Sequence, residues 1–311
     1  MLAISTCWNQ SRHNEGAAII DEILALGVSN IELSHGMSMA KMPGFLDRHR
    51  EGKFTCTGVH NFFPSPVEVF IDAPDAYEFS DKKRQNRDRA IKLTIESIRN
   101  AAKFGAKYIV LHMGTVTNLK HEKGSSLLES MLKEGNEFTA NYGKAKAEFV
   151  QQRQKKAKPF VERAVEALEM FIEPAREHGV KLAIESRSHY EQIPTEDEMV
   201  VLMEQFRDTP EIGYWHDFGH IQRKHNLGLL DHRRWLECMS EFLIGGHFHD
   251  VHWPHKDHRP PFTGNIHYEP LMEHFTPEMP IAWEINNRQS TESIKTALEE
   301  WHKRDYTSRL T

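Results

Sequence analysis

The sequence has few cysteines, no long apolar run and no excess of positive charge. Its three cysteines, Cys7, Cys56 and Cys238, stand far apart in 311 residues. This spacing predicts neither a disulfide framework nor a CxxC metal site and is typical of a reducing compartment. No stretch approaches the roughly 18 apolar residues of a membrane helix, and no signal-peptide pattern opens the chain. A net charge of −6 gives the fold as a whole no electrostatic attraction to DNA or to an anionic membrane. We therefore expect a cytoplasmic protein with no membrane partner.

The composition is sufficient for a folded core, because 39% of the residues are hydrophobic and 27% are charged. Short apolar runs alternate with longer amphipathic stretches along the whole chain. The expected strands are residues 2–8, 30–34, 54–60, 108–112, 180–185, 212–217, 243–249 and 280–285. The expected helices are residues 15–26, 39–50, 82–104, 149–178, 196–206, 228–242, 268–275 and 291–303.

Strands that alternate with helices indicate a parallel sheet, and this number of units predicts one closed (β/α)8 TIM barrel over residues 1–311. An open doubly wound sheet is the alternative, but the chain has no GxGxxG after its first strand and no Walker A loop. The longest irregular stretch follows the fourth strand, and we expect residues 114–145 to form a loop insertion at the catalytic face. Pro159 and Pro174 are expected to break the helix over 149–178 or to mark turn starts.

Histidine is unusually frequent, with 20 residues, of which 11 lie between His216 and His274. Histidine is the commonest metal ligand and acts as an acid or base near neutral pH. Surface residues or a chance bias could account for part of this excess. The informative histidines are therefore those at positions where a barrel gathers its functional groups.

The expected strands three to eight each finish in His, Asp or Glu. These residues are His60, His112, Glu185, Asp217, His247 with His249, and Glu284. The carboxyl ends of the strands meet at the mouth of a barrel, so these side chains should converge there. Such nitrogen and oxygen donors suit Mn²⁺, Mg²⁺, Zn²⁺ or Co²⁺ and do not distinguish among them.

Each of these residues also has an ordinary structural interpretation. Glu185 could form a salt bridge at the rim, and Asp217 could cap the helix that follows it. His60 and His112, taken singly, are more typical of buried histidines that bond to the backbone. Glu284, between two large apolar residues, would be costly to bury without a partner. The joint arrangement favours a metal centre, where the ion would polarise a carbonyl, a carboxylate would take a proton, and the ion would hold the resulting enediolate.

Several short motifs resemble the xylose isomerase-like TIM-barrel superfamily. They are LHMG (111–114), IES (184–186), HDFGH (216–220), HFHDV (247–251), TGNI (263–266) and AWEI (282–285). The superfamily includes sugar isomerases and epimerases, hydroxypyruvate isomerase, inosose dehydratases and apurinic endonuclease IV. The resemblance spans nearly the whole barrel, and the order and spacing of the motifs make it specific.

In the isomerase branch, the resemblance implies one metal ion held by Glu185, Asp217, His247 and Glu284, with His249 as the second choice for the histidine. It also implies that Glu185 and Glu284 are the acid and base and that His220 contacts the substrate. The endonuclease branch holds three zinc ions, and His60, His112, His220 and His258 fall at matching places. That branch has an aspartate where Lys256 stands here, and a lysine would repel a cation. The nearest basic segments, 82–89 and 144–158, more plausibly form solvated helix faces than a DNA-binding surface.

Other polar and aromatic residues are placed by the sequence to bind a substrate at the same rim. They are Trp8, Glu32, His35, Phe62, His112, Arg187, Trp253 and Arg259. Aromatic rings would cover the apolar face of a sugar, and arginines would bind hydroxyl, carboxylate or phosphate groups. The segment around Gly264 is too short for a phosphate-binding nest, which favours a free sugar, polyol or keto acid.

The sequence thus predicts a divalent-metal-dependent isomerase or epimerase of a small hydroxy-carbonyl compound, with no organic cofactor. A sugar or polyol dehydratase on the same site and a metal-dependent phosphodiesterase are the alternatives, and a non-catalytic sugar- or metal-binding barrel is a third. Barrels of this group often form homo-oligomers, but the sequence shows no interface stripe.

Overall fold

The computed structural model describes residues 1–69, 74–120, 124–304 and 306. Within them, eight parallel strands close into a barrel in the order β1-β12-β9-β8-β6-β4-β3-β2. These strands are β1 (Leu2–Ser5), β2 (Asn30–Leu33), β3 (Thr55–His60), β4 (Tyr108–Leu111), β6 (Lys181–Glu185), β8 (Ile212–Asp217), β9 (Leu243–His247) and β12 (Ile281–Trp283). The ring closes because β1 pairs in parallel with both β2 and β12. The predicted (β/α)8 barrel is confirmed, and the open sheet is excluded.

Two apolar layers explain why the strands read as nearly continuous hydrophobic runs. One layer fills the barrel interior and contains Tyr108, Trp215, Val110 and three alanines, while the larger one lies between the strands and the helices. The rings of Tyr108 and Trp215 lie 4.3 Å apart. Gly58 on β3 makes room for this packing, because a Cβ there would fall 2.2 Å from the Tyr108 ring. Strands buried on both faces in this way are typical of parallel barrels.

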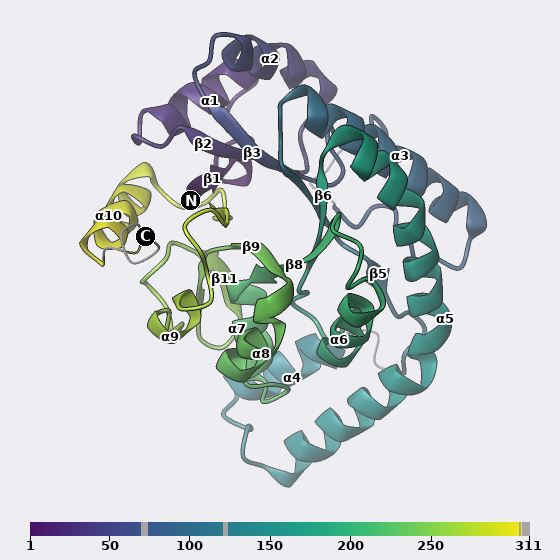
Figure 1. The fold of residues 1–311 in the computed structure, drawn as a ribbon. Helices are drawn as coiled ribbons and strands as arrows, with labels where there is room; N and C mark the ends of the chain where they lie inside the picture. Colours follow the sequence, from purple (N-terminus) through teal and green to yellow (C-terminus); the bar gives the residue numbers. More distant parts are fainter. Residues whose placement is uncertain (70–73, 121–123, 305, 307–311) are drawn as a thin grey trace.

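Helices surround the barrel on its outside (Figure 1). They are α1 (Gly16–Leu24), α2 (Met42–Arg50), α3 (Arg84–Lys103), α4 (Gly124–Lys133), α5 (Ala140–His178), α6 (Glu196–Gln205), α7 (Phe218–Asn226), α8 (His232–Met239), α9 (Glu269–Met272) and α10 (Thr291–Lys303), with short 3₁₀ turns at Thr6–Trp8, Met39–Lys41 and Ser240–Phe242. Among the described residues, no helix combines the length and apolar character that crossing a membrane requires.

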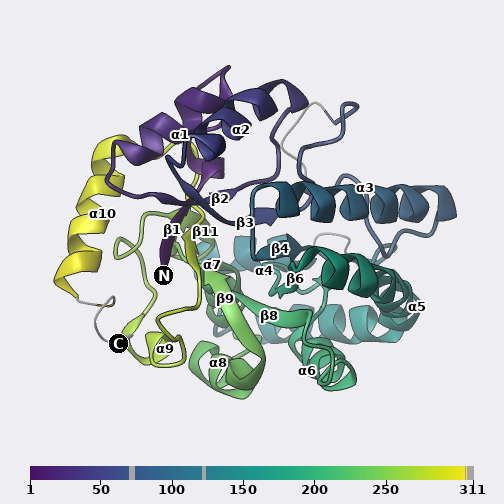
Figure 2. The same cartoon turned by 45° about the horizontal axis from the view of Figure 1, so that its top comes forward.

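Helix α5 contradicts the expectation that its prolines break it. Pro159 and Pro174 both lie inside one continuous helix of 39 residues. The carbonyls that lose their amide partner belong to Lys155 and Met170, which are exposed, so water can bond them. The buried face of α5 packs along α3, and the two helices lie side by side in Figure 2. Tertiary packing therefore outweighs the local cost of the prolines.

The connection after β4 is long, as expected, but it is not a plain loop. It contains β5 (Gly114–Thr115), helix α4 and the first turn of α5, while residues 121–123 of the predicted insertion lie outside the described residues. β5 pairs antiparallel with β7 (Gln192–Ile193), which follows β6. Gly124 at the start of α4 lies against the ring of Phe149, where a Cβ would fall 2.1 Å from it. The insertion is thus packed onto α5 and onto the next βα connection.

Helix α7 lies outside the expected helical ranges, although Asp217 was a possible helix cap, and the next helix begins later than expected. α7 begins directly after Asp217, whose side chain accepts a hydrogen bond from the backbone N–H of His220. The expected helix over 228–242 begins only at His232, where Asp231 caps it. A second connection at the mouth forms a hairpin of β10 (Asp250–His252) and β11 (Lys256–Arg259).

Candidate metal centre

Four predicted ligands from four different strands converge at the carboxyl end of the barrel. Glu185, Asp217 and His247 are the last residues of β6, β8 and β9, and Glu284 directly follows β12. Their donor atoms all lie within 4.8 Å of one another, and all four residues are buried. Nδ1 of His247 lies 2.8 Å from Oε1 of Glu185, 3.3 Å from Oε2 of Glu284 and 3.6 Å from Oδ2 of Asp217. The arrangement is three carboxylates around one imidazole nitrogen.

The electrostatics of this group favour a cation. Burial alone would raise the pKa of Glu185, but the neighbouring His112 and His247 hold it well below its usual range. Burial opposes the charged form of Glu284 as well, and His247 and His258 nevertheless lower its pKa. The pKa of His247 is raised well above its usual value, because the pull of Glu284 and Glu32 exceeds the effect of burial. Charged carboxylates at this depth need a positive partner, which a divalent ion would supply.

Glu32 on β2 lies behind the histidine and away from the mouth. Nε2 of His247 is 3.2 Å from both oxygens of Glu32, which is fully buried. The hydroxyl of Tyr108 donates a hydrogen bond to Oε2 of Glu32 at 2.9 Å. A carboxylate on the far nitrogen is the usual partner that orients a metal-binding histidine. The position of Glu32 at the end of a strand was its only sequence signal, and that signal suggested substrate binding.

Asp217 caps a helix and also offers an oxygen to the candidate metal centre. Its Oδ1 accepts the N–H of His220 at 2.7 Å and caps α7. Its Oδ2 lies 3.1 Å from Nε2 of His249 and faces the four-residue group. The cap and the candidate ligand are therefore different oxygens of one carboxylate.

His249 belongs to a second group of donors, with Asp217, His220 and His258. Nδ1 of His249 accepts the backbone N–H of His258 at 2.9 Å, which leaves Nε2 for Asp217 or an ion. His220 donates from Nδ1 to the carbonyl of Ser186 at 3.0 Å. Nε2 of His258 lies 3.3 Å from Oε2 of Glu284, so this group adjoins the first one.

The expectation that Lys256 would oppose a cation beside His258 does not match the structure, because an acidic side chain lies next to His258 instead. Lys256 is exposed on β11, whereas Asp257 lies 3.2 Å from Nδ1 of His258. Asp257 also accepts a hydrogen bond from Arg223 at 2.6 Å, and Arg223 binds Glu129 on α4 at the same distance. The motif of the endonuclease branch has its aspartate two residues before the histidine, which is position 256 here. In the structure the hairpin instead turns Asp257, one residue before His258, toward that histidine.

A third group joins His60 and His112 to Glu185. Nε2 of His112 lies 2.6 Å from Oε2 of Glu185, and Nε2 of His60 lies 3.7 Å from the same oxygen. His60 is also bonded to the backbone, since its Nδ1 lies 2.9 Å from the carbonyl of Asn61. His35 and His60 form a further possible donor group with Glu284.

Arg187 lies beside the third group and is paired with a residue that the sequence analysis did not single out. Its Nη2 donates to Oδ2 of Asp75 at 2.9 Å, and its Nη1 lies 3.5 Å from Oε2 of Glu185. Oδ1 of Asp75 lies 2.7 Å from Nδ1 of His112. Burial would raise the pKa of Asp75, but Arg187 and His112 hold it far below its usual range.

The other residues predicted to bind substrate lie in different environments, some buried and some exposed. Trp8 is fully buried and donates its indole N–H to the carbonyl of Gln289 at 3.0 Å. Phe62 is buried with its ring edge toward Tyr77. Arg259 lies on β11 opposite Asp250 and is partly exposed, and Trp253 is exposed. Of the residues predicted to bind substrate, five contact or join the donor groups: Glu32, His35, His112, Arg187 and His220.

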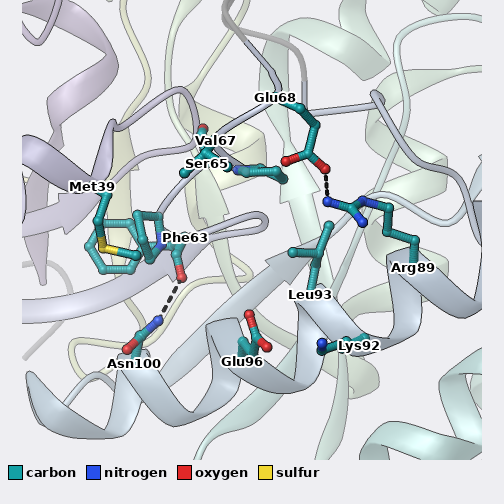
Figure 3. A pocket seen from close by; sticks show the side chains of 12 residues that line it. Met39, Phe63, Ser65, Val67, Glu68, Arg89, Lys92, Leu93, Glu96 and Asn100 are labelled. Atoms are coloured by element: carbon teal, nitrogen blue, oxygen red, sulfur yellow. Dashed lines mark hydrogen bonds and ion pairs between the residues drawn. The ribbon is translucent and has the colours of Figure 1, made fainter.

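A separate pocket lies beside α3, and Figure 3 shows its lining. Residues 63–68 form one wall and α3 forms the other, with Arg89 paired to Glu68 and Asn100 donating to the carbonyl of Phe63 at 3.3 Å. None of the predicted site residues lines this pocket.

Comparisons with known proteins agree with this architecture. A family model described as xylose isomerase-like TIM barrel matches residues 20–304. A solved D-tagatose 3-epimerase-like protein has a TM-score of 0.68 and 13% identity, over 99% of this chain and 97% of its own. D-psicose 3-epimerase from Clostridium cellulolyticum H10, solved with D-tagatose, has a TM-score of 0.66 and 13% identity, over 97% of this chain and 98% of its own. The IolI protein, solved with a bound zinc atom, has a TM-score of 0.61 and 14% identity, over 100% of this chain and 99% of its own.

Identities this low establish a shared fold and nothing finer. None of the curated proteins is significantly similar to the sequence. The match to the family model, in contrast, covers most of the chain. The chain belongs to the xylose isomerase-like TIM-barrel family.

Proposed function

We propose that the protein is a divalent-metal-dependent isomerase or epimerase that acts on a small sugar, polyol or hydroxy-keto compound. The observation that carries this proposal is the pair of buried glutamates, Glu185 and Glu284, whose carboxylates both reach Nδ1 of His247. Epimerases among the solved structures with this fold support the same class of reaction.

The donor set fits a metal ion. Glu185, Asp217, His247 and Glu284 offer oxygen and imidazole donors within 4.8 Å of one another, a combination that suits Mn²⁺, Mg²⁺, Zn²⁺ or Co²⁺. When bound, such an ion would polarise the substrate carbonyl and offset the negative charge of the enediolate. Glu32 would fix the orientation of His247 through its second nitrogen.

The two glutamates would move the proton. Each glutamate has one oxygen near His247. The second oxygen of Glu185, Oε2, faces His112, and the second oxygen of Glu284, Oε1, lies 3.9 Å from Nε2 of His35. The carboxylate form of each glutamate is the form that would accept the proton. A glutamate on each face of a substrate would invert a carbon, and one glutamate moving a proton between neighbouring carbons would isomerise it.

The test is proton exchange from solvent. Metal-loaded protein is incubated in deuterated water with a panel of ketohexoses and aldohexoses, and deuterium at the carbon next to the carbonyl is followed by NMR. Glu185→Gln and Glu284→Gln should each lower exchange by about a hundredfold or more, while Glu237→Gln, on the exposed face of α8, serves as the control. Full exchange by both site variants with metal still bound would overturn the mechanism.

A dehydratase would begin with the same proton abstraction and continue with loss of hydroxide. Mass spectrometry distinguishes this outcome, because the product would be lighter by one water molecule. The same Glu185→Gln and Glu284→Gln variants would lose that activity as well, so the product mass is the deciding measurement.

The flanking donor groups favour a metal-dependent phosphodiesterase as the second candidate. His60 and His112 with Glu185, and His220, His249 and His258 with Asp217, give the mouth donors for more than one ion. Neighbouring ions can stabilise the attacking and leaving oxygens of a phosphodiester. Elemental analysis and a nicking assay on abasic DNA, with and without chelator, test it. One ion per chain and no nicking would exclude this candidate.

A further inference from the structure

Two buried side chains with nitrogen donors at the mouth, Arg187 and His112, share a single carboxylate that comes from a connecting segment. The side chains of Arg187 and His112 are 4% and 11% exposed, whereas that of Asp75 is 37% exposed. Asp75 places one oxygen on each partner, at 2.9 Å from Nη2 of Arg187 and 2.7 Å from Nδ1 of His112. The two nitrogen-bearing side chains are therefore fixed parts of the barrel rim, and the Asp75 carboxylate reaches them from the solvent side.

Asp75 leaves the arginine incompletely satisfied. Nε of Arg187 is buried and has no hydrogen-bond partner among the residues that the structure describes, and Nη1 reaches Glu185 at only 3.5 Å. A guanidinium is a planar fork that matches both oxygens of one carboxylate, yet Asp75 gives it one oxygen. An unpaired donor of a buried arginine is costly, so a ligand that also engaged Nε would bind with added favourable energy.

We propose that Arg187 and His112 form a carboxylate subsite, and that the Asp75 carboxylate occupies it in the place of the acid group of the substrate. The substrate class that follows is a sugar acid, and this part of the inference rests on the proposed isomerase or epimerase function.

The position of the subsite defines where the acid group stands in the molecule. Nε2 of His112 lies on Oε2 of Glu185, and the Asp75 carboxylate lies on the opposite nitrogen of the same ring. The carboxylate of Asp75 is thus one side chain away from a proton-transfer glutamate, because the His112 ring and the Arg187 guanidinium both lie between Asp75 and Glu185. A carboxylate bound there would stand several bonds from the reacting carbons, as the terminal acid group of a uronate does.

The segment that carries Asp75 is anchored outside the subsite. The hydroxyl of Tyr77 donates to Glu68 at 3.0 Å, and the guanidinium of Arg89 lies 5.3 Å from the Tyr77 ring. Figure 3 shows the Glu68–Arg89 pair at the wall of the neighbouring pocket. An incoming carboxylate can therefore replace that of Asp75 while these contacts persist.

Binding of an acid and of its amide tests the subsite directly. Isothermal titration of metal-loaded protein compares D-glucuronate with D-glucuronamide and D-galacturonate with D-galacturonamide, because each pair differs in charge and shares its skeleton. Asp75 competes as a tethered anion, so Asp75→Ala should tighten binding of at least one uronate by tenfold or more and leave its amide within about twofold. Adding Arg187→Gln to Asp75→Ala should abolish the difference. Asp47→Ala, an exposed aspartate on α2, is the control.

Asp75→Asn guards against a loss of structure in Asp75→Ala, because it keeps the shape and removes the charge. Metal content is measured for every variant. If neither variant prefers a uronate over its amide, the subsite does not exist. If both variants bind less metal and no more acid, Asp75 is a positioning residue for His112 and the proposal is wrong.

The outcome is independent of turnover. Tight uronate binding without deuterium exchange in any compound would reject the isomerase function and retain the subsite. Exchange in a neutral ketose without any preference for acids would retain the function and reject the subsite.

Discussion

Glu32 lies directly behind His247, with both of its carboxylate oxygens 3.2 Å from Nε2 of the imidazole. Both side chains are fully buried, and they come from β2 and β9. The opposite nitrogen of His247 faces Glu185 and Glu284. The carboxylate therefore fixes which nitrogen points into the candidate metal centre.

Glu32→Gln should weaken metal binding without removing a ligand. The amide keeps the volume but loses the charge that orients the imidazole, and such changes reduce metal affinity by roughly 10- to 100-fold. Competition with a coloured chelator measures the affinity. Tyr108→Phe removes the hydrogen bond to Glu32 and the longer one to Thr57, and it should give a smaller loss in the same direction. Unchanged affinity in Glu32→Gln would contradict this role.

Asp217→Asn and Asp217→Ala should separate the cap from the metal ligand. Asparagine still caps a helix, so both variants should lose metal, but alanine should cost about 0.5–2 kcal/mol more unfolding free energy in metal-free protein. Asp231→Ala removes the equivalent cap of α8 and should lower stability without affecting metal binding. Urea denaturation and metal titration measure the two effects. Equal stability of the two Asp217 variants would show that the cap contributes little.

Two buried histidines should make the fold sensitive to mild acid. The Nε2 atoms of His216 and His232 lie 3.0 Å apart and share a hydrogen bond. Nδ1 of His216 is hydrogen-bonded to the hydroxyl of Tyr214, and Nδ1 of His232 is hydrogen-bonded to the side-chain oxygen of Gln222. This chain of bonds needs both rings neutral. Burial lowers the pKa of His216 to about 3 and, together with the neighbouring His216, lowers that of His232 well below its ordinary 6.5.

The sign of the pH effect follows from these lowered values. Below about pH 6.5 the unfolded chain binds protons that the folded chain does not, so stability falls as the pH decreases. Each such histidine contributes a slope of about 1.4 kcal/mol per pH unit. His232→Gln should reduce the loss between pH 7 and pH 5 in urea denaturation. His302→Gln, on the exposed face of α10, should not change it. Identical pH profiles for the wild type and His232→Gln would refute the neutral pair.

Pro159→Ala should stabilise the protein. The proline lies inside α5 and forfeits one backbone hydrogen bond, and alanine in a helix interior is favoured by up to about 3 kcal/mol. Thermal unfolding should show a higher midpoint. Glu169→Ala, at an exposed position in the interior of the same helix, is the reference for helix propensity. A lower midpoint for Pro159→Ala would mean that the native helix uses the ring in packing.

The barrel was predictable because its signals are local. Each strand is a short apolar run, and glycines such as Gly27, Gly105 and Gly179 end the helices between them in left-handed conformation. The convergence of Glu185, Asp217, His247 and Glu284 follows from the parallel topology alone. Geometry common to every barrel thus accounts for most of the candidate metal centre.

The rest depends on contacts that no local pattern encodes. Asp75 and Asp257 stand in connections whose paths are set by tertiary packing, so their approach to His112 and His258 has no sequence period. His232 is buried because α7 precedes its helix and covers it, and no local pattern around His232 indicates this burial. The short and strongly polar α7 gave no clear helical period to read.

The missing side chain of Gly58 connects the interior of the barrel to its chemistry. Gly58 admits the ring of Tyr108, the hydroxyl of Tyr108 holds Glu32, and Glu32 holds His247. A methyl group added at position 58 would displace that ring by contact. A substitution of Gly58 in the core would then change the metal affinity, although every candidate ligand would still be present in the sequence. Selection for metal use would in this way act on the volume of residues that never meet the ion.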